Sequence, residues 1–361
     1  KTLRPLMVRA FPEVPANHPA MGAMILNFSA NALGLANAAT PFGIRAMQEL
    51  DKLNPVKGTA SNAMVLFLAM NTSSLTLLPT GVIALRVSAG SMDPAGILAT
   101  TLFATLVSTV CAFGAVKLYQ RFSPVGPAEA SAEMGDSPAP GSASAPEPDV
   151  PEVSAEASSG AYPGWVSVTA LGAIICLIPL AVVYGEVVSP WVIPSLMVAL
   201  LGFGALRRVR VYEVFVEGAR DGFQVALRII PYLVAILVAV AMLRASGALD
   251  IIVGFLSPMT SPFGLPGDAL PMALMRPLSG SGAYGILAAT IQDPSIGPDS
   301  YTGYLVSTFQ GSTETTFYVL AVYYGAVQVR RIRHTLAAAL TADLAGIVGA
   351  VIACSYLFGG R

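Results

Sequence analysis

Long apolar runs alternate with short polar interruptions along most of this chain. Residues 95–119 and 335–358 form uninterrupted apolar runs, each long enough for a helix to cross a bilayer. The apolar run over residues 59–86 is interrupted at Asn71-Thr-Ser-Ser74, and the run over residues 301–329 is interrupted at Gly311-Ser-Thr-Glu314. This pattern predicts an all-α, polytopic integral membrane protein in which plain spanning helices accompany broken or re-entrant helices.

Two further apolar segments carry the same kind of interruption. Residues 20–50 contain asparagines, glycines and a proline between positions 27 and 41, and residues 271–291 are interrupted at positions 276–282. Backbone groups freed at membrane depth are tolerated only where they line protein or water. The four interruptions therefore mark where we expect polar groups to gather.

Composition predicts four parts in the chain. Residues 1–122 and 208–361 each hold two interrupted segments and one plain spanning segment. Between them, residues 123–162 are rich in proline, alanine, serine and acidic residues, which predicts a disordered linker. Residues 163–207 predict a transmembrane hairpin, with helices over 165–188 and 191–206. The first part lacks a counterpart of the apolar run at 225–243, so we expect that its N-terminal portion is missing.

Charge is scarce and unevenly placed. The chain is 54% hydrophobic and 11% charged, with a mean hydropathy of +0.67, whereas soluble domains carry about 25% charged residues. Seven acidic residues fall within 123–162, and elsewhere basic residues outnumber acidic ones by 20 to 14. Several of the basic residues flank apolar runs, which is typical of the cytoplasmic side of a membrane. Nothing in this pattern supports nucleic-acid binding.

The two interrupted parts match one another at a nearly fixed offset. Phe42-Gly-Ile44 aligns with Tyr284-Gly-Ile286, and Asn71-Thr-Ser-Ser74 aligns with Ser312-Thr-Glu-Thr315. This correspondence predicts two repeats whose interruptions at 71–74 and 312–315 face each other.

The plain segments that close the two parts carry their basic residues at opposite ends. Lys117 lies near the end of the first segment and Arg121 follows it. In contrast, the second segment is preceded by Arg330, Arg331 and Arg333. If basic ends are cytoplasmic, the two helices run antiparallel. Inverted repeats with broken helices are typical of secondary transporters.

Four longer stretches carry a family resemblance. Residues 31–47 (NALGLANAATPFGIRAM) and 71–86 (NTSSLTLLPTGVIALR) resemble spore maturation protein A. Residues 276–283 (RPLSGSGA) and 311–323 (GSTETTFYVLAVY) resemble spore maturation protein B. The chain is thus similar to a fusion of the two, over about residues 1–122 and 210–358, and the linker and hairpin depart from the pattern.

The resemblance implies membership of the nucleoside-recognition or "gate" family. That family also supplies membrane parts of ferrous-iron and nucleoside transporters. It implies a multi-pass protein of the bacterial inner membrane, and in spore formers the pair is linked to dehydration of the spore core. Members also occur in bacteria that do not sporulate.

Small polar residues and two ionisable ones gather at the interruptions. We interpret them as the lining of a cavity for a solute: Asn31, Asn37, Thr40, Asn71, Thr72, Ser73, Arg276, Ser279, Ser281, Ser312, Thr313, Glu314 and Thr315. The alternative is that small polar residues join membrane helices. For Arg276 and Glu314 three roles stay open: a structural ion pair, an anion held by Arg276, or a proton or cation coupled by Glu314.

Two functions follow from this pattern. The first is a secondary transporter or permease for a small polar or anionic solute, with nucleoside-like solutes included. The alternative is a non-transporting scaffold or sensor that acts with cell-envelope partners.

A membrane enzyme would need an acid–base pair that the sequence does not offer, so we expect no catalytic residues. We also expect no metal site and no cofactor, and we leave a homo-oligomer open as a partner state.

Overall fold

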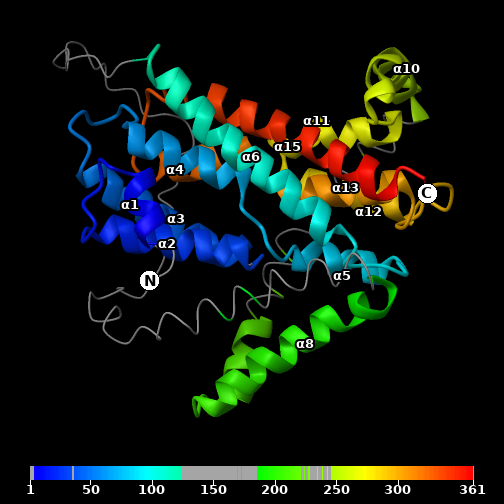
Figure 1. Ribbon diagram of the computed structural model, residues 1–361, viewed down its shortest axis with the longest axis horizontal. Helices are drawn as coiled ribbons and strands as arrows, with labels where there is room; N and C mark the ends of the chain where they lie inside the picture. The colour runs from blue at the N-terminus through cyan, green and yellow to red at the C-terminus, as the bar shows by residue number, and fades with distance from the viewer. Residues whose placement is uncertain are drawn as a thin grey trace.

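The computed structural model describes residues 4–34, 36–123, 185–220 and 245–360, together with isolated positions between 169 and 242. The regular elements in these residues are helices, and one isolated β-bridge joins Thr59 to Arg331 (Figure 1). The predicted all-α class is therefore confirmed for the described part of the chain.

The helices of the first part are short except for the last. Their bounds are α1 (Arg4–Ala10), α2 (Pro19–Ala32), α3 (Ala36–Lys52), α4 (Asn62–Ser73), α5 (Thr80–Ser88) and α6 (Ile97–Gln120). Helices α2 and α3 pack along each other after a tight turn at Gly34, whose φ of +71° suits glycine. A break therefore falls in the segment where the sequence predicts one, although it is shorter than the interval 27–41.

The second part follows the same order of short and long helices. Its bounds are α10 (Ala248–Thr260), α11 (Leu270–Leu278), α12 (Gly280–Gln292), α13 (Tyr301–Ser312), α14 (Thr316–Gly325) and α15 (Thr335–Phe358). Two 3₁₀ turns, η2 (Ser261–Phe263) and η3 (Gly267–Ala269), join α10 to α11. The break between α11 and α12 is confined to Ser279, so Arg276 lies within α11 rather than in the break itself.

Two breaks fall where the sequence predicts them. The first separates α4 from α5 over residues 74–79, and Ser74 has a left-handed conformation with φ of 36°. The second separates α13 from α14 over residues 313–315, where Thr313 and Thr315 are extended. Both breaks leave backbone groups without helical partners, so these groups need hydrogen bonds from other parts of the molecule.

Helices α6 and α15 lie side by side at the centre of the molecule (Figure 1). They run antiparallel. Ser108, in the middle of α6, donates to the carbonyl of Ala342, in the first half of α15, at 2.8 Å. Thr100, near the start of α6, contacts Thr308, which in turn contacts Cys354 near the end of α15. Small residues permit this close packing, and a Cβ atom on Gly349 would lie 3.2 Å from Cα of Ala104.

The same two helices have membrane character. In the described residues, α6 and α15 are the helices long and apolar enough to cross a bilayer, and each has 24 residues. A shorter apolar stretch spans Pro194–Leu206 at the end of α8 (Gly185–Leu206). The helical class and these two spans are consistent with a membrane protein.

The predicted hairpin at 163–207 is wrong in one respect. Helix α8 runs without interruption from Gly185 to Leu206, so no turn separates Val188 from Trp191. Pro190 lies inside this helix, and helices in an apolar setting can carry proline when neighbouring groups satisfy the freed carbonyl. The predicted linker at 123–162, apart from Ser123, and most of the first hairpin helix lie outside the described residues.

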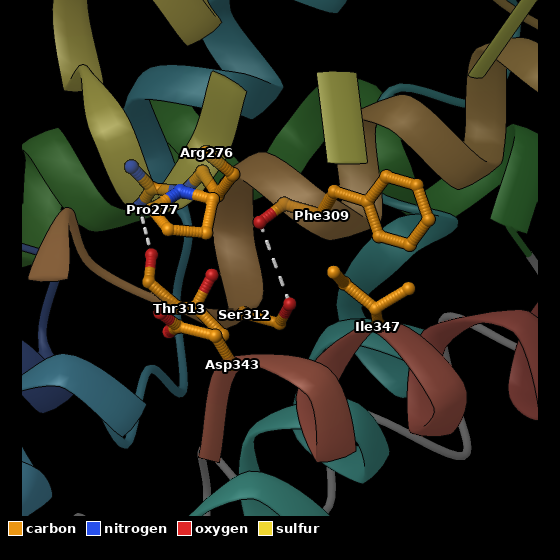
Figure 2. Close-up of a pocket in the computed structure, with 7 residues that line it drawn as sticks. All are labelled: Arg276, Pro277, Phe309, Ser312, Thr313, Asp343 and Ile347. Atoms are coloured by element: carbon orange, nitrogen blue, oxygen red, sulfur yellow. Dashed lines mark hydrogen bonds between the residues drawn. The ribbon is translucent and has the colours of Figure 1, made fainter. Parts of the chain in front are cut away.

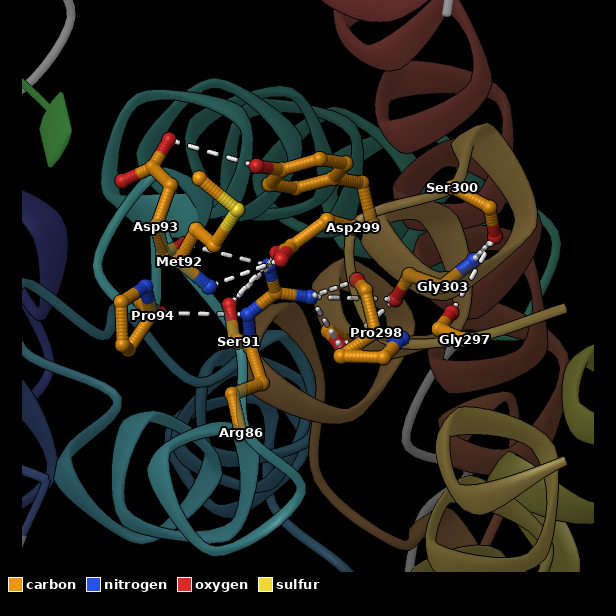
Figure 3. Close-up of polar contacts among 12 residues, drawn as sticks. Arg86, Ser91, Met92, Asp93, Pro94, Gly297, Pro298, Asp299, Ser300 and Gly303 are labelled. Carbon is orange, nitrogen blue, oxygen red and sulfur yellow. Dashed lines mark hydrogen bonds and ion pairs between the residues drawn. The ribbon is translucent and has the colours of Figure 1, made fainter. Parts of the chain in front are cut away.

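A fully buried arginine joins the two parts at one end of the molecule. Arg86, near the end of α5, donates to the carbonyls of Pro94 and Pro298 at 3.2 and 2.6 Å (Figure 3). It also forms an ion pair with Asp299 at 3.0 Å and lies over the ring of Tyr304. These contacts tie the segment before α6 to the segment before α13.

Candidate functional site

The two breaks meet in a direct backbone contact. The amide of Glu314 donates to the carbonyl of Thr72 at 2.8 Å, so a break in the second part uses a carbonyl at the end of α4. On the other side of the first break, Thr105 of α6 donates to the carbonyls of Ser73 and Ser74 at 2.9 and 2.5 Å. The prediction that these interruptions face each other is confirmed.

Arg276 organises the second break from within α11. Its guanidinium donates to the carbonyl of Gln310 at 3.3 Å, to the carbonyl of Thr313, and to the hydroxyl of Thr315 at 3.1 Å. The side chain is buried, at 4% exposure. One arginine therefore satisfies two carbonyls that the end of α13 leaves free.

Arg276 and Glu314 form a loose ion pair. Nη2 of Arg276 lies 3.9 Å from Oε2 of Glu314, and the Glu314 side chain is 31% exposed. The pairing of these two residues, one of the roles that the sequence leaves open, is thus present. A pair at this distance makes no strong hydrogen bond, so either partner can exchange it for another group at moderate cost.

Asparagines form a second polar cluster on the other side of the contact. Asn31 of α2 donates to Oδ1 of Asn71 at 3.1 Å, and Asn71 donates to the carbonyl of Phe67 at 2.9 Å. Asn27 donates to the hydroxyl of Tyr323 at 3.2 Å, which places α14 against this cluster. The amides therefore join α2, α4 and α14 and also make part of the polar surface beside the breaks.

Several other predicted residues use their side chains locally. Thr72 and Ser73 donate to the carbonyls of Ala69 and Met70 at 2.8 and 3.0 Å within α4. The Ser73 hydroxyl also lies 3.1 Å from that of Thr109 on α6, which matches the alternative role of joining helices. Ser312 donates weakly to the carbonyl of Phe309 at 3.4 Å. Their backbone atoms, more than their hydroxyls, contribute to the contact between the breaks.

The remaining four predicted residues lie less centrally. Ser279 caps α12 by accepting from the amide of Gly282 at 3.1 Å, and its hydroxyl lies 3.5 Å from that of Ser281. Thr40 is half-buried on α3 and makes no side-chain hydrogen bond with the other candidates in the described residues. Asn37 is also on α3, and its side chain lies outside the described residues.

A narrow pocket lies next to the second break (Figure 2). Arg276 and Pro277 of α11 line one side, Phe309, Ser312 and Thr313 line a second, and Asp343 and Ile347 of α15 line the third. Two of these residues are ionisable and both are buried at 4% exposure. The pocket thus brings a guanidinium and a carboxyl group together with two hydroxyl residues and three apolar ones.

Asp343 and Tyr323 are site residues that the predicted set omits. Asp343 stands in the middle of an apolar 24-residue helix, and a carboxylate in that setting is a recognisable signal of function. Tyr323 gives no comparable signal, because its role depends on the meeting of α14 with α2 and α4. In the described residues no group of three or more His, Cys, Asp or Glu side chains could hold a metal ion.

Comparison with known proteins places the chain in a family. A family model described as "Gate: Nucleoside recognition" matches residues 226–330. Spore maturation protein B of Bacillus subtilis is 46% identical over 167 residues, which cover 46% of this chain and 93% of that protein. The chain belongs to the spore maturation protein B family. No solved structure matches it.

Two further relatives extend this assignment. Spore maturation protein A of Bacillus subtilis is 48% identical over 107 residues, which cover 30% of this chain and 55% of that protein. Inner membrane protein YjiG of Escherichia coli K12 is 34% identical over 83 residues, which cover 23% of this chain and 54% of that protein. The chain spans about half the length of these two relatives. The resemblance to a fusion of spore maturation proteins A and B is confirmed, and a membrane location is supported.

Proposed function

We propose that this protein is a secondary transporter or permease for a small polar or anionic solute. It would cross the bacterial cytoplasmic membrane several times, and we assign it no catalytic chemistry. The observation that carries the proposal is the backbone contact between the breaks at Thr72 and Glu314. A spanning region built for packing alone has no need of two non-helical segments that meet, because each break costs helical hydrogen bonds.

The groups around the contact suit solute recognition. Arg276 offers positive charge, Glu314 a partly exposed carboxylate, and Asn31 and Asn71 amides. The arrangement supports an asymmetric site in which the second part supplies the charge and the first part supplies neutral donors and acceptors. Such a set could hold a solute that carries an anionic or amide-like group.

An inverted repeat is the architecture that we propose for this function. Antiparallel α6 and α15, and breaks that precede each of them, support it. In transporters of this type the substrate site lies between the repeats, near the middle of the bilayer. The contact between residues 72 and 314 occupies that place in the proposed architecture.

Solute counterflow in proteoliposomes tests the proposal. Purified protein is reconstituted into vesicles loaded with one unlabelled solute at a time, from a panel of nucleosides, organic anions and small amides. Uptake of the same labelled solute above that of empty vesicles supports transport. Absence of exchange across the whole panel, from protein that is folded and inserted, contradicts it.

A non-transporting scaffold or sensor is the second candidate. It is favoured by the narrowness of the pocket and by predicted lining residues, such as Thr72 and Ser73, whose hydroxyls are already satisfied by α4 and α6. It predicts no counterflow, and stable capture of an envelope protein whose binding requires residues 123–162.

A further inference from the structure

Asp343 is a buried carboxylate that is only half satisfied. Its Oδ2 accepts from the hydroxyl of Thr316 at 2.6 Å, at the start of α14. Its Oδ1 has no hydrogen-bond partner among the described residues, and Asp343 lines the pocket that Arg276 also lines (Figure 2). An ionised carboxylate in this state is costly, whereas the neutral acid is much less so.

Arg276 has an unused donor in the same pocket. Its Nε has no partner among the described residues, and its ion pair with Glu314 is long, at 3.9 Å. No ion pair within 4.0 Å joins Arg276 to Asp343. The guanidinium therefore has two carboxylates within its surroundings, a partly exposed one that it holds loosely and a buried one that it does not hold.

A neutral group makes a comparable contact in the first part of the chain. Helices α6 and α15 both have 24 residues, and Thr105 and Asp343 stand at the same position counted from the first residue of each. Each side chain contacts the break of its own part, Thr105 through the carbonyls of Ser73 and Ser74 and Asp343 through Thr316. Because the hydroxyl of Thr105 is sufficient to contact a break, contact with Thr316 alone does not explain a carboxyl group at Asp343.

We propose that Asp343 is a proton-binding site that controls the partner of Arg276. With a proton on Asp343, Arg276 holds Glu314 and the carbonyls of residues 310 and 313. When the proton leaves, Arg276 turns to the ionised Asp343 and releases these groups, so that the contact between the breaks loosens. The role in transport rests on the proposed function, but the proton site itself does not.

A proton fits this site better than a metal cation. Arg276 already supplies positive charge to the pocket, and no cluster of three potential metal ligands occurs in the described residues. The elements packed on α15 bring few charged groups toward Asp343: Arg276 comes from α11, Glu314 from the break, and none from α4. The other titratable groups on these elements are Cys111, Lys117 and Tyr119 of α6, Tyr301 and Tyr304 of α13, and Tyr318, Tyr323 and Tyr324 of α14.

Infrared difference spectroscopy of the full chain in lipid tests the proton site without any solute. As the pH is raised, the wild type should lose a carboxylic-acid C=O band, and this band should shift when aspartate carries carbon-13 in its side-chain carboxyl. Asp343→Asn should lack the band, whereas Asp268→Asn, an exposed control, and Glu314→Gln should retain it. A wild type without an aspartic-acid band, or a band that persists in Asp343→Asn, overturns the proposal. If Asp343→Asn does not fold, Asp343→Glu should remove the band's sensitivity to labelled aspartate.

Hydrogen–deuterium exchange tests the coupling to the break. After correction for the intrinsic pH dependence, wild-type amides over residues 310–318 should exchange faster at high pH, by tenfold or more, while Asp343→Asn keeps them protected. Equal protection at both pH values in the wild type contradicts the switch. Because neither measurement uses a solute, a failure of counterflow would leave the proton site standing, and absence of the band would leave transport standing.

Discussion

Two buried arginines in this protein differ in how completely they are held. Arg86 has 0% exposure and is held by several carbonyls, Asp299 and the ring of Tyr304. Arg276 is nearly as buried, yet its Nε is unused among the described residues and its carboxylate partner is 3.9 Å away. The first is fixed in place and suits a structural joint, whereas the second can change partner.

Loss of Arg86 should destabilise the protein strongly. Arg86→Ala leaves several buried carbonyls without this donor and takes from Asp299 its cationic partner, although Ser91 and the amide of Met92 still donate to that carboxylate. Breaking a buried ion pair from one side costs about 3–5 kcal/mol. The stability of Arg86→Lys should fall between those of the wild type and Arg86→Ala, since an ammonium group cannot reproduce the planar fork of donors in a guanidinium group. The midpoint of thermal unfolding in detergent checks this, with the exposed Arg121→Ala as a control that should match the wild type. An unchanged midpoint for Arg86→Ala contradicts the structural joint.

At the scale of helices, the break at 313–315 approaches α15 closely because α15 has a glycine there. A Cβ atom on Gly346 would lie 2.7 Å from Cγ2 of Thr313 and 3.4 Å from Cβ of Ser108. The 2.7 Å contact requires Thr313 to shift, whereas the distance to Ser108 is an ordinary contact. Gly346 therefore lets the second break, α6 and α15 meet beside Asp343.

Substitution of Gly346 should push the break away from α15. Gly346→Ala should lower stability by about 1–3 kcal/mol through overpacking. The matched control is Gly114→Ala on α6, where a Cβ meets nothing within 4 Å, and where alanine should leave the unfolding midpoint unchanged or raise it. If both variants melt alike, the close approach at Gly346 is not present in solution.

The positions of these elements could be predicted where local chemistry decides them. Apolar length fixed the bounds of α6 and α15, and the runs of serine, threonine and glycine placed the breaks before α5 and α14. The turn predicted between residues 188 and 191 is wrong because α8 continues through Pro190, with the apolar run on both sides. The partners of Arg86, Asp343 and Tyr323 could not be predicted, since each lies on another helix and depends on packing that no local pattern encodes.

At the scale of the whole molecule, the two parts of the chain interleave. Helix α13 packs against α6 and α15, and α14 packs against α3 and α4. Thr100 of α6 and Thr308 of α13 meet with their hydroxyls 2.8 Å apart. The site between the breaks therefore exists only when both parts are present and docked.

A disulfide should trap this docking. The protein is prepared in a cysteine-free background with a protease site inserted between residues 123 and 162. Thr100→Cys and Thr308→Cys then place two thiols where the native hydroxyls lie 2.8 Å apart, so a disulfide can form between them. After oxidation and cleavage, the two parts should stay joined on a non-reducing gel. The control carries Val110→Cys, on the exposed face of α6, in place of Thr100→Cys, together with Thr308→Cys. In this control the two parts of the cleaved chain should separate on the gel. Separation of both pairs contradicts the interleaved arrangement.

The central claim is that the charged groups at the meeting breaks handle a solute. Once counterflow identifies a solute, the same assay on Arg276→Gln and Glu314→Gln tests this claim most directly. Each variant should lose about tenfold or more of the exchange rate, because a charge-assisted contact contributes about 1.5–3 kcal/mol. The surface ion pair of Arg210 and Glu213, 83% and 60% exposed, supplies matched controls in Arg210→Gln and Glu213→Gln, which should exchange like the wild type. Wild-type exchange by both Arg276→Gln and Glu314→Gln would contradict the account.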